Sequence, residues 1–293
     1  METPTRMRID THVHLLPPGR LDGLLRWMRR SFPEHPIEEG VSLELLRSEL
    51  REAGVERIFN LVYPLDRSET GPLNRFNLEL AERWPEIVPF GSLHPDDPRK
   101  DEIVVRLLEE FGFVGIKFHP FVQKFDPFSE SMVPVYRTLN SYRRPLVIHT
   151  GYEEFYGGDL PVRGFRELAS RYPDMPLVLV HMLFPHLDEA FRMLGEFPQV
   201  YLDATNVFGS LKMMRAGMEP QDVAPIERNL LACVEEFKGR VFFGSDHPAG
   251  MGDLSTIFTD AEAFPMSSEA KRFLFQDAAR QFILRFSPET LAA

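Results

Sequence analysis

The stretch PLVIH, residues 145–149, contains the pattern that decides the fold. Pro145 interrupts the preceding helical segment, a short continuous apolar run follows, and His149 ends the run. Continuous apolar runs of this length are typical of strands that are buried on both faces, as in a parallel sheet covered by helices. We therefore predict a buried parallel strand at this position.

The same pattern recurs along the whole chain of 293 residues. Amphipathic helical segments separate the apolar runs, and a Gly or Pro precedes each later run, because Gly favours the left-handed end of a helix and Pro cannot continue one. The predicted strands are residues 7–15, 57–63, 87–93, 113–118, 145–149, 176–181, 199–204 and 240–246.

Eight such units allow either a closed barrel or an open doubly wound sheet. A dinucleotide-binding sheet would carry GxGxxG after its first strand, and LLPPGRLDG at 15–23 lacks that motif. We predict an α/β fold, a single (β/α)8 barrel domain over residues 1–293, with its site at the C-terminal ends of the strands. Residues 16–40 are predicted as a long excursion before the first helix, which begins after the candidate N-cap Ser42, and as a rim or lid element.

Composition and charge exclude several classes of protein. Apolar residues make up 43% of the chain, no run approaches the roughly 18 apolar residues of a membrane helix, and METPTRMRID does not resemble a secretory signal. We therefore expect a cytoplasmic protein without a membrane partner. The formal net charge of −11 would repel a phosphate backbone, so we expect no nucleic-acid partner. The single cysteine, Cys233, lies in an amphipathic helical segment and is predicted to be buried there.

Polar side chains that can bind metals or carry charge end several of the apolar runs. In a barrel these ends converge on one rim. Because side chains alternate along a strand, His12 and His14 can both face the barrel axis, and Asp10, of the same parity and deeper, could orient one of them. The polar residues at these ends are His12, His14, Lys117, His119, His149, His181 and Asp246.

The joint pattern predicts a metal site. Taken singly, a strand-end histidine is more often a hydrogen-bonded core or surface residue, and Asp246 in GSDHP could simply cap a turn. Burying several imidazoles and a carboxylate together costs free energy, however, unless they are paired or bind a cation. We therefore expect a divalent metal at the rim; His and Asp suit zinc, but also manganese, cobalt or iron.

Five motifs occur in the order seen in a known family. They are IDTHVH (9–14), GIKFHP (115–120), VIHTG (147–151), LVLVHM (177–182) and FGSDHP (243–248), and they span nearly the whole chain. On these motifs the sequence resembles the amidohydrolase superfamily. The resemblance is strongest to the amidohydrolase-2 branch, which includes enzymes of the aminocarboxymuconate-semialdehyde decarboxylase type. LVLVHM departs from the more usual G-H-x-G form around its histidine.

The resemblance implies a distorted barrel with one or two divalent ions, commonly zinc, and a small-molecule substrate. His181 matches a histidine that aids catalysis beside a single metal or binds a second one, and Lys117 matches a lysine that binuclear members carboxylate. Members of the branch are often dimers, so the resemblance admits a homodimer. The metal ligands that it implies are His12, His14, His149 and Asp246, with His181 as the ligand of any second ion.

Two reactions fit such a site. The first hypothesis is hydrolysis of a small ester, lactone, amide or related bond by a metal-activated water, with Asp246 moving the proton and His181 stabilising the oxyanion. Lys117 would bind a substrate carboxylate or pair with a nearby acid, and His119 would contact substrate or cap its strand end. The second hypothesis is non-oxidative decarboxylation of an aromatic or unsaturated acid at the same site.

Two further alternatives are weaker. The intact set of rim residues argues against a barrel that only binds a ligand, and the acidic charge argues against a nuclease. Substrate specificity is expected in the loops at 15–41, 120–130, 151–163 and 205–220, because the loops that follow barrel strands surround the site.

Overall fold

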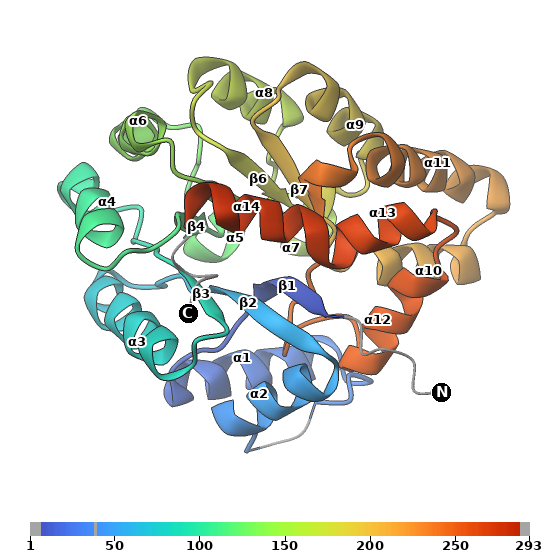
Figure 1. The fold of residues 1–293 in the computed structure, drawn as a ribbon, viewed down its shortest axis with the longest axis horizontal. Helices are drawn as coiled ribbons and strands as arrows, with labels where there is room; N and C mark the ends of the chain where they lie inside the picture. Colours follow the sequence, from blue (N-terminus) through green and yellow to red (C-terminus); the bar gives the residue numbers. More distant parts are fainter. Residues whose placement is uncertain (1–6, 38–39, 288–293) are drawn as a thin grey trace.

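The computed structural model describes residues 7–37 and 40–287 of the chain. Parallel strands alternate with helices along it and lie at its centre (Figure 1). Every predicted strand is confirmed. The strands are β1 (Arg8–Val13), β2 (Val55–Leu61), β3 (Ile87–Phe90), β4 (Ile116–Phe118), β5 (Leu146–His149), β6 (Leu177–Val180), β7 (Val200–Asp203) and β8 (Val241–Phe242).

The strands form two parallel sheets that join into a barrel. One sheet has the order β1-β2-β3 and the other the order β4-β5-β6-β7-β8. At the first seam, the Gly91 N–H donates to Gly115 O at 2.9 Å. At the second seam, the Asp246 N–H donates to His12 O at 2.8 Å. The predicted (β/α)8 barrel is therefore confirmed, and the second seam brings the residues around His12 beside those around Asp246.

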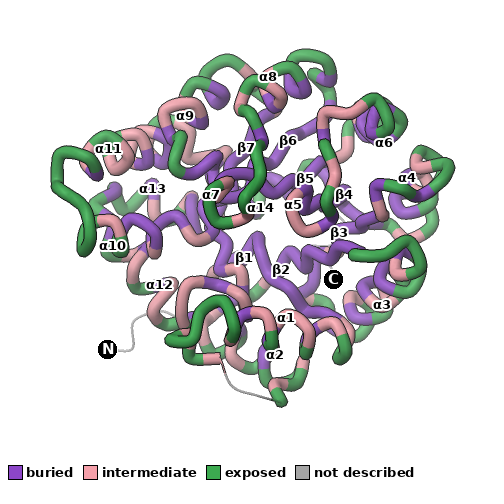
Figure 2. The backbone as a smooth tube through the Cα atoms, turned by 180° about the vertical axis from the view of Figure 1, so that it is seen from behind, coloured by how far each residue is buried: buried purple, intermediate pink, exposed green. Residues whose placement is uncertain are grey.

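Helices surround the strands, with their exposed faces outward and their buried faces against the barrel (Figure 2). The predicted helix at Leu43 does begin after Ser42, whose side chain accepts a hydrogen bond from the Leu45 N–H. The helices are α1 (Pro18–Ser31), α2 (Leu43–Glu52), α3 (Thr70–Arg83), α4 (Lys100–Glu109), α5 (Pro120–Gln123), α6 (Val133–Tyr142), α7 (Glu153–Tyr156), α8 (Val162–Arg171), α9 (Leu187–Glu196), α10 (Val207–Gly217), α11 (Pro220–Glu236), α12 (Leu254–Ala263), α13 (Ser268–Arg272) and α14 (Ala278–Phe286).

The segment after β1 differs from the prediction. Residues 16–40 were expected to be an excursion before the first helix, but α1 fills much of this segment. Pro18 occupies the first turn, where a missing N–H costs nothing, and Leu21, Leu25 and Met28 are buried at helical spacing.

The barrel interior has two layers: an apolar lower layer near α14, and an upper layer at the C-terminal ends of the strands. Val147, Val178, Tyr201 and Phe242 point inward from neighbouring strands and pack against α14. Phe282 of α14 closes this end, and Figure 1 shows α14 crossing the strands there. Two residues further along β5 and β7, the same inward faces carry His149 and Asp203 in place of apolar residues, and these two belong to the site.

Two smaller expectations concern the rest of the chain. Cys233 is buried in α11, as predicted. Among the helices of the described residues, none combines the length and the hydropathy that crossing a bilayer requires.

Candidate metal centre

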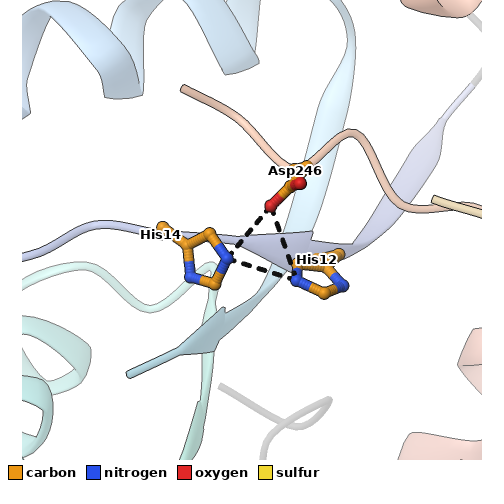
Figure 3. Close-up of side chains that lie close together, drawn as sticks. All are labelled: His12, His14 and Asp246. Carbon is orange, nitrogen blue, oxygen red and sulfur yellow. Dashed lines mark hydrogen bonds and ion pairs between the residues drawn. The ribbon is translucent and has the colours of Figure 1, made fainter. Parts of the chain in front are cut away.

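His12, His14 and Asp246 converge at the C-terminal end of the barrel (Figure 3). The Nε2 atoms of the two histidines lie 3.2 Å apart. Asp246 Oδ1 lies 3.0 Å from His14 Nε2 and 3.6 Å from His12 Nε2. Both histidine side chains are almost fully buried, and Asp246 keeps 14% of its side chain exposed. Two segments that are more than 200 residues apart in the chain thus deliver three donors to one point.

This geometry fits a divalent cation. Ligand atoms about 2.0–2.1 Å from a tetrahedral ion lie roughly 3.3 Å from one another. The three separations of 3.0, 3.2 and 3.6 Å bracket that value. Two imidazole nitrogens and a carboxylate oxygen are donors that suit zinc, manganese, cobalt or iron. The cluster is therefore a candidate divalent metal site, as the sequence predicted.

Each histidine of the cluster has its ring oriented by a hydrogen bond at Nδ1, on the side away from the candidate centre. His14 Nδ1 lies 2.6 Å from the carbonyl oxygen of Leu61, and His12 Nδ1 lies 2.7 Å from Asp203 Oδ2. A carbonyl or carboxylate acceptor holds the proton on Nδ1 and leaves the Nε2 lone pair for a metal. Both Nε2 atoms accordingly face the candidate centre.

The carboxylate that orients His12 is Asp203 at the end of β7, and the prediction that assigned this role to Asp10 was wrong. Asp10 is fully buried, but its Oδ1 accepts the backbone N–H groups of His12 and Ser245 at 3.1 and 2.9 Å. It therefore joins the backbones of β1 and the segment after β8. The parity argument failed because the pairing of β1 with β2 shifts register between Asp10 and Val13.

Sequence reasoning missed Asp203, although QVYLDA shows the signal used elsewhere, an apolar run that ends in a polar residue. Thr205 holds its Oδ1 through both its N–H, at 2.9 Å, and its hydroxyl. Burial raises the pKa of Asp203 to about 6, although the Thr205 hydrogen bonds and the nearby charges of His181 and Lys117 lower it. Gly244 lies so close to this pair that an added Cβ would overlap Thr205 Oγ1.

Asn206 is a second residue that the sequence analysis missed. Its Nδ2 donates to Asp246 Oδ2 at 2.9 Å, so the carboxylate is held on one oxygen while the other faces the histidines. Both residues adopt left-handed backbone conformations, with φ of 64° for Asn206 and 63° for Asp246. Burial acts to raise the pKa of Asp246, but the His14 hydrogen bond and the histidine charges outweigh it and lower that pKa.

His149 and His181 lie beside the cluster as a pair. His149 Nδ1 lies 3.2 Å from His181 Nε2, and the His181 ring stacks against that of His12 with centroids 5.7 Å apart. Neither belongs to the group of three donors that converge, so the structure does not assign them as ligands. His149 Nε2 is buried and has no hydrogen-bond partner among the described residues. Burial lowers the pKa of both imidazoles, which keeps them neutral.

The backbone at His181 is strained. His181, Met182 and Leu183 have φ values of 61°, 55° and 57°, a left-handed conformation that costs roughly 1–2 kcal/mol per residue. Leu183 stands where the usual G-H-x-G form has its second Gly, which adopts this conformation without penalty. The turn directs His181 Nδ1 to the carbonyl of Thr205 at 2.8 Å, and strain of this kind is common at functional sites.

Lys117 and His119 lie on the same rim. Lys117 is fully buried, and its Nζ has no hydrogen-bond partner within the described part of the chain. Burial lowers its pKa to about 8, against the opposing charges of Asp203 and Asp246. His119 stacks on His149 with centroids 3.8 Å apart, and its Nδ1 accepts the N–H of Val122 at the start of α5. His119 therefore caps a helix and also faces the site.

Aromatic side chains cover the histidines, and the sequence analysis did not identify them. The Tyr63 ring lies 5.6 Å from that of His14, and the Tyr152 ring lies 5.1 Å from that of His181. The Tyr156 ring lies 5.1 Å from that of His149 and stacks on Phe121. They come from loops after three different strands, where no periodic pattern distinguishes a site residue from a core residue.

Comparisons with known proteins agree with this arrangement. A family model described as amidohydrolase matches residues 9–290. A search of curated proteins returned no significant match.

Solved structures share the fold at low sequence identity. They include an uncharacterised TIM-barrel protein from Bordetella bronchiseptica, with 18% identity and a TM-score of 0.71 over 95% of this chain and 99% of that one. A 5-carboxyvanillate decarboxylase from Novosphingobium aromaticivorans, in complex with manganese, has 16% identity and a TM-score of 0.66 over 94% and 95%. A 2,6-dihydroxybenzoate decarboxylase from Rhizobium has 14% identity and a TM-score of 0.65 over 94% and 98%.

At these identities the solved structures establish the fold alone, whereas the family match covers nearly the whole chain, including every polar residue of the rim. The chain belongs to the amidohydrolase-2 family of the amidohydrolase superfamily.

Proposed function

We propose that this protein is a metal-dependent decarboxylase of an aromatic or unsaturated carboxylic acid. The observation that carries the proposal is the Lys117 ammonium, which is fully buried with no hydrogen-bond partner among the described residues. A buried charge without a partner costs several kcal/mol, so such a cation is retained where a ligand supplies the missing anion. A substrate carboxylate beside the metal centre is that anion.

Three features favour decarboxylation over hydrolysis, which was the first hypothesis from the sequence alone. A carboxylate in contact with Lys117 is the group that a decarboxylase removes, whereas a neutral ester, lactone or amide leaves the ammonium unpaired. Among the similar structures are decarboxylases of 5-carboxyvanillate and of 2,6-dihydroxybenzoate. The flat aromatic walls formed by Tyr63, Phe121 and Tyr156 also suit a planar substrate.

The reaction needs one proton and no oxidant. The bond between the ring carbon and the carboxylate breaks, its electron pair stays on that carbon, carbon dioxide leaves, and a proton forms the new C–H bond. We assign the proton delivery to His181 Nε2, because its Nδ1 proton is committed to the Thr205 carbonyl. The neutral imidazole has no proton on Nε2, so His181 takes one up from solvent to form the imidazolium before the step and returns to the neutral form when it gives that proton to the carbon. Asp246 is less suited, since its Oδ1 faces the cation site beside the two histidines and its Oδ2 accepts from Asn206.

The other residues hold the reactants. Lys117 binds the carboxylate, His119 and Tyr156 border the ring, and Asp203 keeps the His12 ring oriented. His12, His14 and Asp246 would hold the cation, and His149, whose buried Nε2 has no partner among the described residues, would be a further ligand. When bound, the divalent metal supplies positive charge that orients and polarises the substrate oxygens. Zinc was expected from the resemblance, but manganese in a similar structure makes Mn²⁺ the first ion to test.

The direct test is a substrate panel with the Mn²⁺-loaded and Zn²⁺-loaded protein. Hydroxylated benzoates and unsaturated diacids are assayed for released carbon dioxide, and matched esters, lactones and amides for hydrolysis. The proposal expects carbon dioxide from at least one acid, with an activity that Lys117→Met strongly reduces. Hydrolysis of a neutral substrate, unaffected by Lys117→Met and without carbon dioxide from any acid, would reverse the assignment.

A further inference from the structure

Helix α7 is a single turn that lies over the histidines, in the loop after β5. None of its residues is buried. It is bounded by two residues in left-handed conformations, Tyr152 with φ of 58° and Gly157 with φ of 64°. Such positions absorb changes of backbone direction at the ends of an element that moves. Figure 2 shows α7 near the centre of the barrel, over the face opposite to that in Figure 1.

The inner side of α7 contacts the site. The Tyr156 hydroxyl lies 3.4 Å from His119 Nε2, and the Tyr156 ring meets the His149 ring edge to face. The preceding Tyr152 hydrogen-bonds Ser210 Oγ at 2.7 Å. This short turn therefore determines where one tyrosine ring lies relative to the histidines.

The outer side of α7 contacts α1. The Phe155 ring stacks on that of Phe32 with centroids 5.4 Å apart and lies 6.0 Å from that of Trp27. Trp27 and Phe32 are themselves 5.9 Å apart. Phe155 and Phe32 remain 47% and 39% exposed, so the contact is thin. Among the described residues, the only further ring contact of the three is that of Phe155 with Tyr156 on the same turn, at 4.9 Å, and such exposed rings are poorly explained as core packing.

We propose that Trp27, Phe32 and Phe155 form an aromatic latch that holds α7 down and thereby positions Tyr156 against the bound substrate. His12, His14, His149 and His181 are each at most 4% exposed, so a substrate reaches them only after part of their cover moves. α7 is a single turn of that cover and has no buried residue. Its release admits the substrate, and its return places Tyr156 over the ring and excludes water. The inference rests on the proposed function in taking a planar carboxylate as the occupant.

The latch is tested first without any ligand, by hydrogen exchange. Three backbone hydrogen bonds report on α7: Phe155 N–H to Tyr152 O, Tyr156 N–H to Tyr152 O, and Gly158 N–H to Glu153 O. Phe32→Ala removes two of the ring contacts and is expected to speed exchange in residues 153–158 by about tenfold. The matched control is Leu284→Ala, which truncates a 52% exposed side chain on α14 and is expected to change nothing there. Equal exchange in wild type and Phe32→Ala would overturn the latch.

The second test measures the role of Tyr156 with Mn²⁺ and salicylate as probes. Phe32→Ala is expected to weaken salicylate binding about tenfold, because it no longer holds the Tyr156 ring over the substrate. Tyr156→Phe keeps that ring and is expected to weaken salicylate binding by less, and both variants should leave Mn²⁺ affinity unchanged. Only Phe32→Ala should speed exchange, because Tyr156→Phe keeps the ring contacts. Unchanged salicylate affinity in both variants would remove Tyr156 from the substrate site. Faster exchange in Phe32→Ala, combined with a wild-type protein that binds no salicylate, would support the latch and count against the carboxylate substrate instead.

Discussion

The lower and upper layers of the barrel interior are built on the same strands but follow opposite rules. In the lower layer, Val147 and Tyr201 pack against α14 in an apolar core. Two residues further along the same inward faces, His149 and Asp203 are equally buried but polar. Apolar burial stabilises the lower layer directly, whereas the upper layer costs free energy that a bound cation and substrate offset. The difference separates what holds the fold from what performs the chemistry.

The largest expected effect is the loss of a metal donor in the upper layer. His14→Ala should reduce turnover by at least about a thousandfold, because the cation contributes several kcal/mol of charge stabilisation in reactions of this type. The melting temperature of the metal-free protein should stay close to that of wild type, since no apolar contact of the lower layer is lost. Turnover, Mn²⁺ affinity by titration and metal-free melting temperature are the three measurements. A large drop in the metal-free melting temperature would show that His14 also supports the fold.

The opposite result is expected in the lower layer. The Phe282 ring contacts three other rings of this layer. Its centroid lies 5.0 Å from that of Tyr201, 5.2 Å from that of Phe242 and 4.7 Å from that of Phe286. Phe282→Ala should lower the free energy of unfolding by about 3–5 kcal/mol, as for other large-to-small core substitutions. Turnover per folded molecule should not change at low temperature. Denaturant titration measures the free energy of unfolding, and turnover is measured per folded molecule. Loss of turnover in fully folded Phe282→Ala would contradict the separation of the two layers.

Removing the carboxylate that holds a metal-binding histidine in place should have a smaller effect than removing the histidine itself. Asp203→Asn keeps the shape of the side chain but removes the carboxylate that holds the His12 ring at 2.7 Å. Loss of such a partner typically weakens metal binding by about 10–100-fold. Asp10→Asn is the matched control, because Asp10 is equally buried but bonds Ser245 and the His12 backbone, not a histidine ring. Equal Mn²⁺ affinities for both variants would mean that Asp203 does not orient His12.

The smallest effect is a dependence on pH. Burial lowers the pKa of Lys117 to about 8, so its ammonium is present below that pH and is lost as the pH rises. The kcat/KM for an acid substrate should therefore fall above pH 8, by about tenfold per pH unit if the ammonium is essential. In Lys117→Met, kcat/KM should be low and should lack this fall. A fall above pH 8 that persists in Lys117→Met would assign it to another group.

A carbamate on Lys117 would change that prediction, because a carboxylated lysine carries no ammonium. Carbon-13 NMR of the protein equilibrated with labelled bicarbonate distinguishes the two states. We expect no carbamate resonance. Its appearance would favour a second metal ion bridged by Lys117.

The same two layers explain how much could be predicted from the sequence. The eight strands and the convergence of His12, His14 and Asp246 were predictable, because continuous apolar runs and residues at their ends depend on local patterns. The hydrogen-bond partner of His12 was not, because a register shift in β1 turned Asp10 away and brought in Asp203 from β7. Asn206 and Tyr156 were missed because left-handed and single-turn segments have no periodicity.

The most direct test of the metal centre is elemental analysis together with a crystal structure of Mn²⁺-loaded protein, collected with anomalous scattering. The account predicts one bound ion per chain, with an anomalous peak at about 2.0–2.3 Å from His12 Nε2, His14 Nε2 and Asp246 Oδ1. A protein that binds no stoichiometric divalent metal, or a peak away from these three atoms, would contradict it.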